Sequence, residues 1–534
     1  MNCIANFLPY QHTGYFSRLI VDYLEDAASL RPFYSHRPTL EGILSAIHDR
    51  RQYPTNRKVL VKELKNQYRG FELNEITSRN LDQLLDDNCF TVTTAHQPAI
   101  FTGPLYFIYK ILHTIKLADF LAKEIPDNKF VPVFFMGSED ADLQELGQIY
   151  LDHEKITWDA RQSGAVGRMK PKELDPIFSR IEGEYSVQPF GRELLDLLKR
   201  CYLESDSIQT ATFKLVHSLF ENYGLIILIP DNANFKKLML PVFEDDLFNH
   251  KPSLLVGKTI HDLSAEYEIQ ANPRDINLFY LKGDIRERIA IEEGTYHVVG
   301  TDIHFSEEEM RKELKEYPER FSPNVILRGL FQETILPNIA FLGGGSEIGY
   351  WLEFKNMFGH YQVPYPVQIM RNSFLIIEKR WRDKLEKARI AMDDIFKSEE
   401  DLVGELVKKE SRHQLNLEKE IEDANAYYEN LKRISLPIDP TLTQYVDALK
   451  TKAVKPIVDL EKKLLKAEKR KFEDQRMHIH SIKSALFPMD NLQERIENFM
   501  PYYAEWGREF INMIYQHSLA LEQQFVVLEE VNAS

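Results

Sequence analysis

The sequence predicts an α/β protein with a parallel sheet at its core and a long antiparallel helical hairpin towards the C-terminus. Two observations carry this prediction. Residues 90–136 hold two short β-rich apolar runs separated by a strongly apolar helical stretch. A strand–helix–strand order of this kind implies a parallel sheet. Residues 417–467 carry apolar residues every three or four positions among Lys, Arg and Glu, which is typical of paired amphipathic helices.

The first 90 residues are expected to form a helical segment that packs on the core. Residues 15–24 show apolar side chains at helical spacing, and Pro32 and Pro38 mark breaks after them. Another helical stretch opens at Pro54. Residues 1–90 are therefore assigned to an N-terminal helical segment.

The predicted catalytic core covers residues 91–375. Its first strand is expected at 90–94, its first helix at 105–123 and its second strand at 130–136. The loop at 95–104 would then connect the end of a strand to the start of a helix. Ligands of open α/β sheets bind at such a turn.

A later core strand is expected at 225–229, and core composition returns at 325–337 and 339–342. The stretches near 155–215 and 245–320 are more polar and show no clear period. We interpret both stretches as irregular insertions between core elements.

The helical hairpin is assigned to residues 376–485. Its two apolar stripes run over 417–431 and 442–467, and a proline-rich turn at 437–440 separates them. Such a hairpin predicts an assembly surface, although its charged faces could also be only solvated. The aromatic-rich segment 486–534 is expected to fold back onto the core.

Composition excludes several classes of protein. The 66 basic and 82 acidic residues give a formal net charge of −16, which argues against sequence-independent nucleic-acid binding. Cys3, Cys89 and Cys201 show no C-x-x-C spacing, so neither a thiolate zinc site nor a disulfide framework is predicted. No signal-peptide pattern and no apolar run of membrane-spanning length is found, so we expect a cytoplasmic protein that does not bind membranes.

The loop at 95–104 is the first candidate site. Backbone N–H groups and the helix dipole favour anions at such a turn, and His96 and Gln97 would face the crevice. Tyr106 and Lys110 follow on the helix, where Lys110 could neutralise an anionic group. The alternative is a capped helix with an exposed histidine. Neither a G-x-G-x-x-G motif nor a phosphate-binding P-loop is present, so neither NAD nor P-loop use of ATP follows.

An acidic loop after the second predicted strand is the second candidate. Glu139, Asp140 and Asp142 lie within four positions, and Glu145 follows them. Clustered carboxylates repel each other unless an amine, a magnesium ion or sugar hydroxyls meet them. The alternative is a helix N-terminus enriched in acids.

A glycine-rich segment is the third candidate. Gly343 and Gly344 would let the backbone approach a ligand closely, and Glu347 and Tyr350 follow at a predicted helix start. The alternative is a flexible turn.

Arg328 and Arg371 lie beside core segments, and Gln332 lies one helical turn after Arg328. Arginine is rarely buried without a partner. Both arginines are therefore candidates for carboxylate recognition, because the guanidinium matches a carboxylate bidentately.

Taken together, these segments resemble the cysteine-adding enzyme family of the bacillithiol pathway, the cysteine ligases. The residues that carry the resemblance are 14–17 with 31–33, His96 and Gln97 with 102–106 and Lys110, the acidic loop 138–142, 322–325, Arg328, Gln332, 336–337, Gly343, Gly344, Glu347, 350–351, 371–373, 486–488 and 492–495. Ala95 and Ala141 depart from the family pattern, which has Gly and, in many members, His at these positions.

The resemblance implies a Rossmann-type core related to class I synthetases and nucleotidyltransferases, with connecting insertions and a coiled-coil domain that forms a homodimer. It also implies that L-cysteine is added to glucosaminyl-malate through an amide bond, as the last step of bacillithiol biosynthesis. Because a free carboxylate must be activated first, ATP or another nucleotide is the expected cofactor, and no metal is predicted.

The resemblance also implies roles for individual residues. His96, Gln97 and Lys110 would meet the activated carboxylate or phosphates. Glu139, Asp140 and Asp142 would meet an amine or hydroxyls. The expected substrate-binding residues are Thr102, Gly103, Tyr106, Arg328, Gln332, Gly343, Gly344, Glu347, Tyr350 and Arg371. Two other functions remain open: a nucleotidyl transferase with a different acceptor, and a non-catalytic coiled-coil scaffold with a ligand-binding core.

Overall fold

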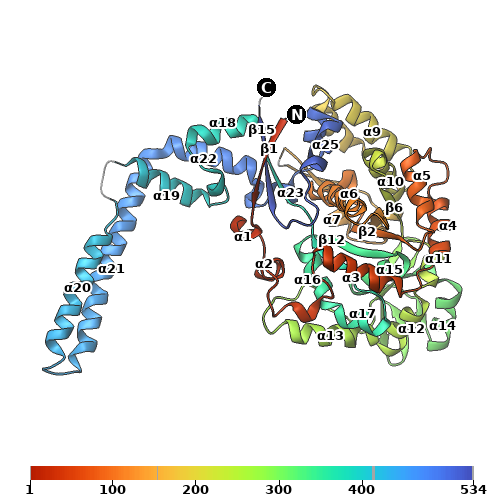
Figure 1. Ribbon diagram of the computed structural model, residues 1–534, viewed down its shortest axis with the longest axis horizontal. Coiled ribbons are helices and arrows are strands. Elements are labelled where there is room, and N and C mark those ends of the chain that lie inside the picture. Colours follow the sequence, from red (N-terminus) through yellow and green to blue (C-terminus); the bar gives the residue numbers. More distant parts are fainter. Residues whose placement is uncertain (1, 153, 412–414, 532–534) are drawn as a thin grey trace. The chain divides into compact units, whose positions relative to one another are not determined.

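The computed structural model describes residues 2–152, 154–411 and 415–531. The chain forms two compact units, which are described separately (Figure 1). The first unit holds the residues up to Ile376 together with those from Asn491 onwards. The second unit is Ile377–Asp490.

A five-stranded parallel sheet forms the centre of the first unit, as predicted. Its strands are β2 (Cys89–His96), β3 (Lys129–Met136), β6 (Ile226–Leu228), β12 (Asn338–Gly343) and β13 (Val367–Met370). Their order is β13-β12-β2-β3-β6, and every neighbouring pair is parallel. This is a doubly wound order in which the chain direction across the sheet reverses between β2 and β12. The carboxyl ends of strands flanking such a switch point form a ligand-binding crevice.

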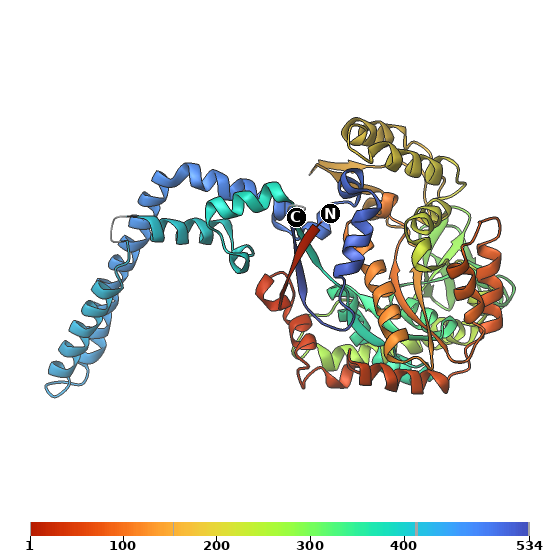
Figure 2. The same cartoon turned by 45° about the horizontal axis from the view of Figure 1, so that its top comes forward.

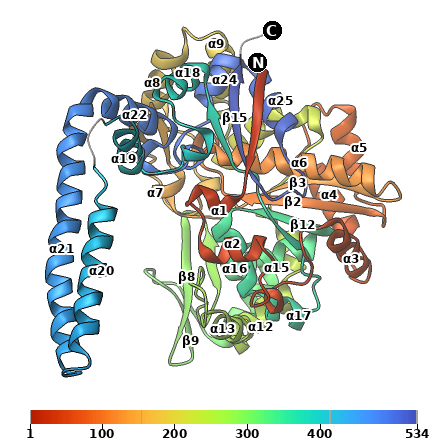
Figure 3. The ribbon, with the colours of Figure 1, turned by 60° about the vertical axis from the view of Figure 1, so that its left-hand side comes forward.

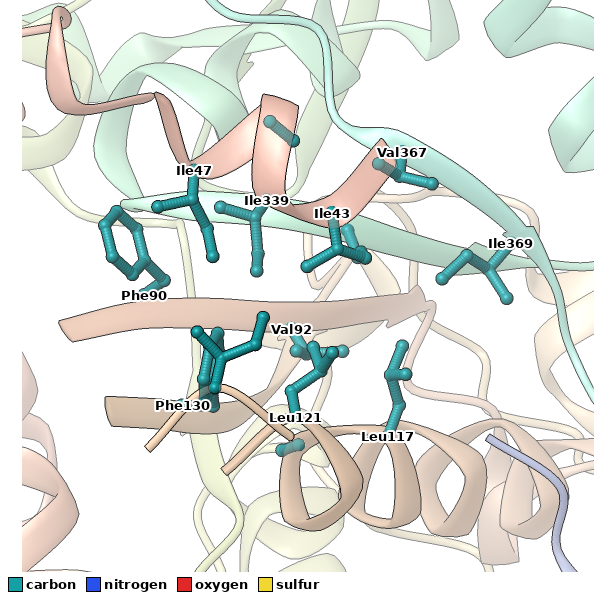
Figure 4. Packing of buried hydrophobic residues seen from close by; sticks show 14 of the residues in the cluster. Ile43, Ile47, Phe90, Val92, Leu117, Leu121, Phe130, Ile339, Val367 and Ile369 are labelled. Carbon is teal, nitrogen blue, oxygen red and sulfur yellow. The ribbon is translucent and has the colours of Figure 1, made fainter. Parts of the chain in front are cut away.

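Helices α3 (Leu40–Arg51) and α6 (Tyr106–Glu124) cover one face of this sheet (Figure 4). Ile43 and Ile47 of α3 and Leu117 of α6 are buried in one cluster with strand residues such as Val92, Ala340 and Val367. Full burial of each such side chain contributes about 1.5–3 kcal/mol, so this cluster anchors the sheet.

The other face of the sheet is covered by α15 (Val325–Ile335) and α16 (Gly345–Glu353). The ring of Phe135 on β3 lies 6.3 Å from that of Phe331 on α15. The ring of Phe341 on β12 lies 4.7 Å from that of Trp351 on α16. The strands are thus buried on both faces, which explains their almost continuous apolar sequences.

The N-terminal segment is mostly helical, but the prediction of helix is wrong for its first residues. Asn2–Leu8 forms strand β1, which pairs antiparallel with β15 (Phe525–Val531). Figure 2 shows the two strands side by side, and β15 also neighbours β14 (Phe374–Ile377). A strand whose partner lies at the other end of the chain leaves no local signal. The helices of the segment besides α3 are α1 (Tyr10–Thr13), α2 (Arg18–Leu24), α4 (Arg57–Gln67) and α5 (Glu75–Gln83).

The two stretches interpreted as irregular insertions are in fact largely regular. The first holds α8 (Asp175–Tyr185), α9 (Gly191–Leu203) and α10 (Ile208–Phe220). Leu194 and Leu198 of α9 are fully buried although the surrounding sequence is polar. An amphipathic helix needs only one apolar face, so a stretch of high average polarity can still be helical.

The second stretch contributes to a separate antiparallel sheet of order β10-β9-β8-β7-β11. Its strands are β7 (Leu278–Lys282), β8 (Ile285–Glu292), β9 (Thr295–Val298), β10 (His304–Phe305) and β11 (Phe321–Pro323). The accompanying helices are α12 (Leu240–Asn249), α13 (Lys251–Leu263) and α14 (Glu307–Glu316). This sheet leads directly into α15, so it reaches the central sheet through β11.

The second unit contains the predicted helical hairpin, formed by α20 (Glu418–Ser435) and α21 (Leu442–Lys469) (Figure 3). Lys432 pairs with Asp447 at 2.8 Å and Lys450 with Glu429 at 2.9 Å, and both ion pairs join the two helices. The unit also holds α18 (Lys379–Ala388), α19 (Glu399–Glu410) and α22 (Glu473–Leu486). No described helix is both long and apolar enough to cross a membrane.

Candidate active site

A cleft of about 620 Å³ lies at the carboxyl ends of β2, β3 and β12. Residues from the loop before β7, from β8 and from α15 complete its walls. The titratable side chains that line it are His96, Lys110, Glu139, Asp140, Glu145, Arg274, Arg286, Arg328, Glu347, Arg371 and Arg495. Of the other predicted residues, Gln97, Tyr106, Gly344 and Tyr350 also line it. The three candidate segments are therefore brought together in one cleft.

His96 is the last residue of β2, paired in register with Met136, rather than a loop residue. Its ring lies 5.4 Å from each of the rings of Tyr106 and Phe107. Its Nε2 is buried and has no hydrogen-bond partner among the described residues. Burial, followed by the charge of Lys110, holds the pKa of His96 well below its usual range. The imidazole is therefore neutral near pH 7, and its Nε2 can form one hydrogen bond with a ligand.

Lys110 is buried and fully engaged within the protein. Its Nζ donates to the carbonyl oxygen of Ala95 and to Oε2 of Glu347, both at 2.6 Å. Glu347 also accepts the N–H of Gly344 at 2.8 Å. Lys110 thus joins the end of β2 to the start of α16 across the switch point. Its charge is already balanced by Glu347, so the pair, not the lysine alone, faces the cleft.

Glu139 forms a buried ion pair with Lys236 of α11 (Ala233–Lys237). Burial raises the pKa of Glu139, and the neighbouring Asp231 raises it further, while Lys236 opposes the shift. Asp231 in turn pairs with Arg168 at 2.6 Å. The carboxyl group of Glu139 thus lies in the cleft wall at the edge of a buried charge network.

Asp140 accepts a hydrogen bond from Nε2 of Gln97 at 3.1 Å, which links the acidic loop to the first loop. Asp142 does not line the cleft. It is exposed and caps α7 (Leu143–Leu146), where its side chain accepts the N–H of Glu145 at 3.0 Å. Asp142 therefore occupies the position of an acid at a helix N-terminus, and its assignment to substrate stays a prediction that its position does not favour.

The two predicted arginines differ. Arg371 is buried, and its Nη2 donates to Oε1 of Glu494 at 2.8 Å. Its guanidinium also lies 4.9 Å from the ring of Tyr106. Arg328 donates to the hydroxyl of Tyr350 at 2.6 Å and has no acidic partner among the described residues. The charge of Arg328 is thus available to a ligand, whereas that of Arg371 is compensated by Glu494.

Three further arginines of the cleft, Arg274, Arg286 and Arg495, were missed by the sequence interpretation. Arg274 and Arg286 lie in the stretch interpreted as an irregular insertion, and Arg495 lies far along the chain after the hairpin. None sits in a local motif. The only signal available was that 492–495 belonged to the family resemblance.

Four other predicted residues lie beside the cleft wall without lining it. Thr102 and Gly103 have φ of +70° and +65°, and the carbonyl of Gly103 accepts from Asn498 at 2.6 Å. A Cβ at Gly343 would lie 2.9 Å from the Cβ of Glu347, so this glycine permits close packing. Gln332 is buried and donates to Glu333 at 2.9 Å. These residues support the cleft, and direct substrate contact by them is not supported by their positions.

Sequence comparisons identify the family. Residues 3–372 match the N-terminal Rossmann-like domain of "Bacillithiol biosynthesis BshC", and residues 374–530 match its C-terminal coiled-coil domain. The chain belongs to the BshC family. The resemblance and the Rossmann-type, coiled-coil fold class are thereby confirmed. Every cleft-lining residue except Arg495 lies within the Rossmann-like match.

Relatives in the BshC family match almost the whole chain. A protein of Flavobacterium psychrophilum named "Putative cysteine ligase BshC" is 38% identical, over 99% of each chain. A Flavobacterium johnsoniae protein of the same name is 37% identical, also over 99% of each chain. A solved structure described as a putative arginyl-tRNA synthetase from Campylobacter jejuni is 12% identical and covers 79% of this chain and 98% of its own. Its TM-score of 0.23 is too low to support any argument.

Proposed function

We propose that this member of the BshC family is a ligase that joins L-cysteine to glucosaminyl-malate through an amide bond, in the last step of bacillithiol biosynthesis. One observation supports this function above the others. A single cleft holds the acids Glu139 and Asp140 together with unpaired arginines and a neutral His96. Such a cleft suits a substrate amine and substrate carboxylates at the same time.

Amide formation from a free carboxylate requires activation, and bound ATP or another nucleotide would supply it. The groups suited to hold such an anion are those around the switch point: the unpartnered Nε2 of His96, the start of α16 at Gly344 and Gly345, and Arg495. The Lys110–Glu347 pair keeps these elements together without adding net charge. Burial and the surrounding cations keep the imidazole of His96 neutral. Its unpartnered Nε2 would donate a hydrogen bond to the activated carboxylate.

The amine of glucosaminyl-malate arrives as an ammonium and must lose a proton before it attacks. Asp140 and Glu139 lie after β3, next to His96 at the end of β2. Asp140, which has no cationic partner within ion-pair distance among the described residues, would bind the ammonium and take up its proton, while Glu139, paired with Lys236, would face the same end of the substrate. Gln97 orients Asp140 through its hydrogen bond. In this assignment His96 and the acids act on different substrates in one cleft.

Reconstitution tests the function directly. The full chain is incubated with ATP, L-cysteine and glucosaminyl-malate, and bacillithiol is measured by mass spectrometry with each component omitted in turn. We expect product only when all three are present. Nucleotide turnover that does not depend on cysteine would instead indicate a nucleotidyl transferase with another acceptor. Binding without any turnover would indicate a scaffold.

We also propose that two copies of the chain associate through the α20–α21 hairpin. Apolar side chains remain exposed on this hairpin: Tyr427 at 60%, Ile438 at 76% and Tyr445 at 64%. Light scattering coupled to size-exclusion chromatography should give a dimer for the wild type and a monomer for the Ile438→Asp, Tyr445→Asp variant. An unchanged mass for the variant would refute this assignment. The exposed Lys452→Glu substitution on the same helix serves as the charge control.

A further inference from the structure

Three arginines of the cleft have no ion-pair partner among the described residues. Arg274 comes from the loop before β7, Arg286 from β8 and Arg328 from α15. Among the described residues, none of the three has a carboxylate within ion-pair distance. Lys110 and Arg371, in the same cleft, each have one. Arginine in a partly enclosed position without a counter-charge is unfavourable unless a ligand supplies the anion.

Arg286 is held in a fixed orientation. Its Nε donates to Oγ of Ser322 on β11 at 3.2 Å, and its guanidinium lies 4.1 Å from the centre of the Phe279 ring on β7. Phe279 is paired in register with Ser322, and Leu281 with Arg286, so three adjacent strands position the side chain. These contacts leave both terminal nitrogens available for a bidentate carboxylate.

Arg274 and Arg328 are connected by a buried hydrogen-bond network. Oδ1 of Asn277 accepts from the backbone N–H of Arg274 and from Nδ2 of Asn324, both at 3.1 Å. Asn324 caps α15, and Arg328 lies one turn further along that helix. Asp246 holds Asn277 in turn, accepting its backbone N–H at 2.7 Å and its side-chain N–H at 3.0 Å. The arginines are therefore set by the scaffold before any ligand binds, which reduces the cost of ordering them.

We infer that Arg274, Arg286 and Arg328 form a subsite for a dicarboxylate, which in the proposed function is the malyl group of the amine substrate. This assignment rests on the proposed function. The malyl group carries two carboxylates, and its attached sugar carries the amine. Burial lowers the pKa of Arg286, while the charges of Asp140 and Glu139 act to raise it, and these acids line the same cleft. An amine bound to them would therefore lie near the arginines. One molecule with an amine at one end and two carboxylates at the other would satisfy both groups.

Steady-state kinetics test the subsite. Arg286→Gln and Arg274→Gln should each raise KM for glucosaminyl-malate by roughly 10- to 100-fold, because a charge-assisted hydrogen bond to each is lost. KM for L-cysteine should change by less than about twofold, which corresponds to well under 1 kcal/mol. The control is Arg288→Gln, an exposed arginine on the same strand that does not line the cleft. An Arg286→Gln enzyme with an unchanged KM for glucosaminyl-malate would overturn the subsite while leaving the ligase function intact.

Calorimetry with free L-malate separates this inference from the proposed function. The wild-type chain should bind L-malate, and Arg286→Gln should bind it at least about tenfold more weakly. If the wild type makes no bacillithiol but shows this difference, the dicarboxylate subsite stands and the ligase function falls. If L-malate binds equally to both proteins, or to neither, the subsite is wrong. Thermal denaturation of each variant checks that it is folded.

Discussion

Charged side chains on the two sides of the cleft differ in whether they have an ion-pair partner. At the switch point between β2 and β12, Lys110 and Arg371 are buried and each is matched by a carboxylate, at 2.6 Å and 2.8 Å. On the side formed by the second insertion, Arg274 and Arg286 have no such partner among the described residues. Matched charges serve the architecture, because they hold separate segments together. Unmatched charges gain no ion-pair stabilisation from the fold, so an anionic ligand would stabilise them.

The largest expected effect comes from His96, which is neutral and so belongs neither to the matched nor to the unmatched charges. His96→Ala removes the neutral imidazole whose Nε2 lacks a partner. We expect kcat for ligation to fall by about 10²- to 10³-fold, the usual range for loss of one hydrogen bond to the reacting carboxylate, with little change in stability. Wild-type turnover by this variant would remove His96 from the reaction. His113, a buried histidine whose ring Nε2 hydrogen-bonds to the carbonyl of Ala520, is the comparison, since its substitution should act on stability instead.

Breaking a matched pair should chiefly destabilise the fold. Glu494→Gln leaves the buried guanidinium of Arg371 without a counter-charge, so the free energy of unfolding should fall by about 3–5 kcal/mol. Arg286→Gln, which removes an unmatched charge, should change it by less than about 1 kcal/mol or raise it. Denaturant unfolding measures both variants. Equal losses of stability would abolish the distinction between the two sides of the cleft.

Asp246 holds Asn277, which in turn binds the backbone of Arg274, and it predicts a pH dependence of stability. Burial raises the pKa of Asp246 from 3.8 to about 7, so the folded chain holds a proton on this group that the unfolded chain has released. This contribution to stability is present below about pH 4 and is lost as the pH rises towards 7, by roughly 2–4 kcal/mol at most. Unfolding curves at pH 5 and pH 7 should therefore differ less for Asp246→Asn than for the wild type. An identical pH dependence for both would contradict the buried position of this group.

The smallest effect is expected outside the cleft. Asp142→Ala removes the cap of the short helix α7 and should cost about 0.5–1 kcal/mol. KM and kcat should stay within about twofold of the wild type. A large loss of turnover would instead support Asp142 as a substrate-binding residue. Asp140→Asn, two residues earlier in the same loop, should by contrast impair turnover.

The fold was predictable where its signals are local. The apolar runs that became β2 and β3 and the stripes that became α20 and α21 carry their periods in adjacent residues. Strand β1 escaped notice because its partner β15 lies at the far end of the chain. The helices of the first insertion escaped because their buried leucines are diluted by polar neighbours.

The candidate site shows the same division. His96 ends β2, Asp140 follows β3 and Glu347 follows β12. The rules for parallel sheets place ligands at these strand ends, and all three residues line the cleft. Arg274 and Arg286 reach it only through the pairing of β8, β7 and β11, which no spacing in the sequence reveals. Arg371 was recognised as a buried cation, but its partner Glu494 lies beyond the hairpin. Sequence patterns thus predicted which residues lie near the cleft better than they predicted which charged residues lack an ion-pair partner.

Residues beyond the hairpin close the catalytic unit. Asn498 binds the carbonyls of Phe101 and Gly103, Glu494 neutralises Arg371, and β15 completes the sheet with β1. A chain without residues 491–531 would therefore leave the buried guanidinium of Arg371 without its counter-charge and the loop at 101–103 without its anchor.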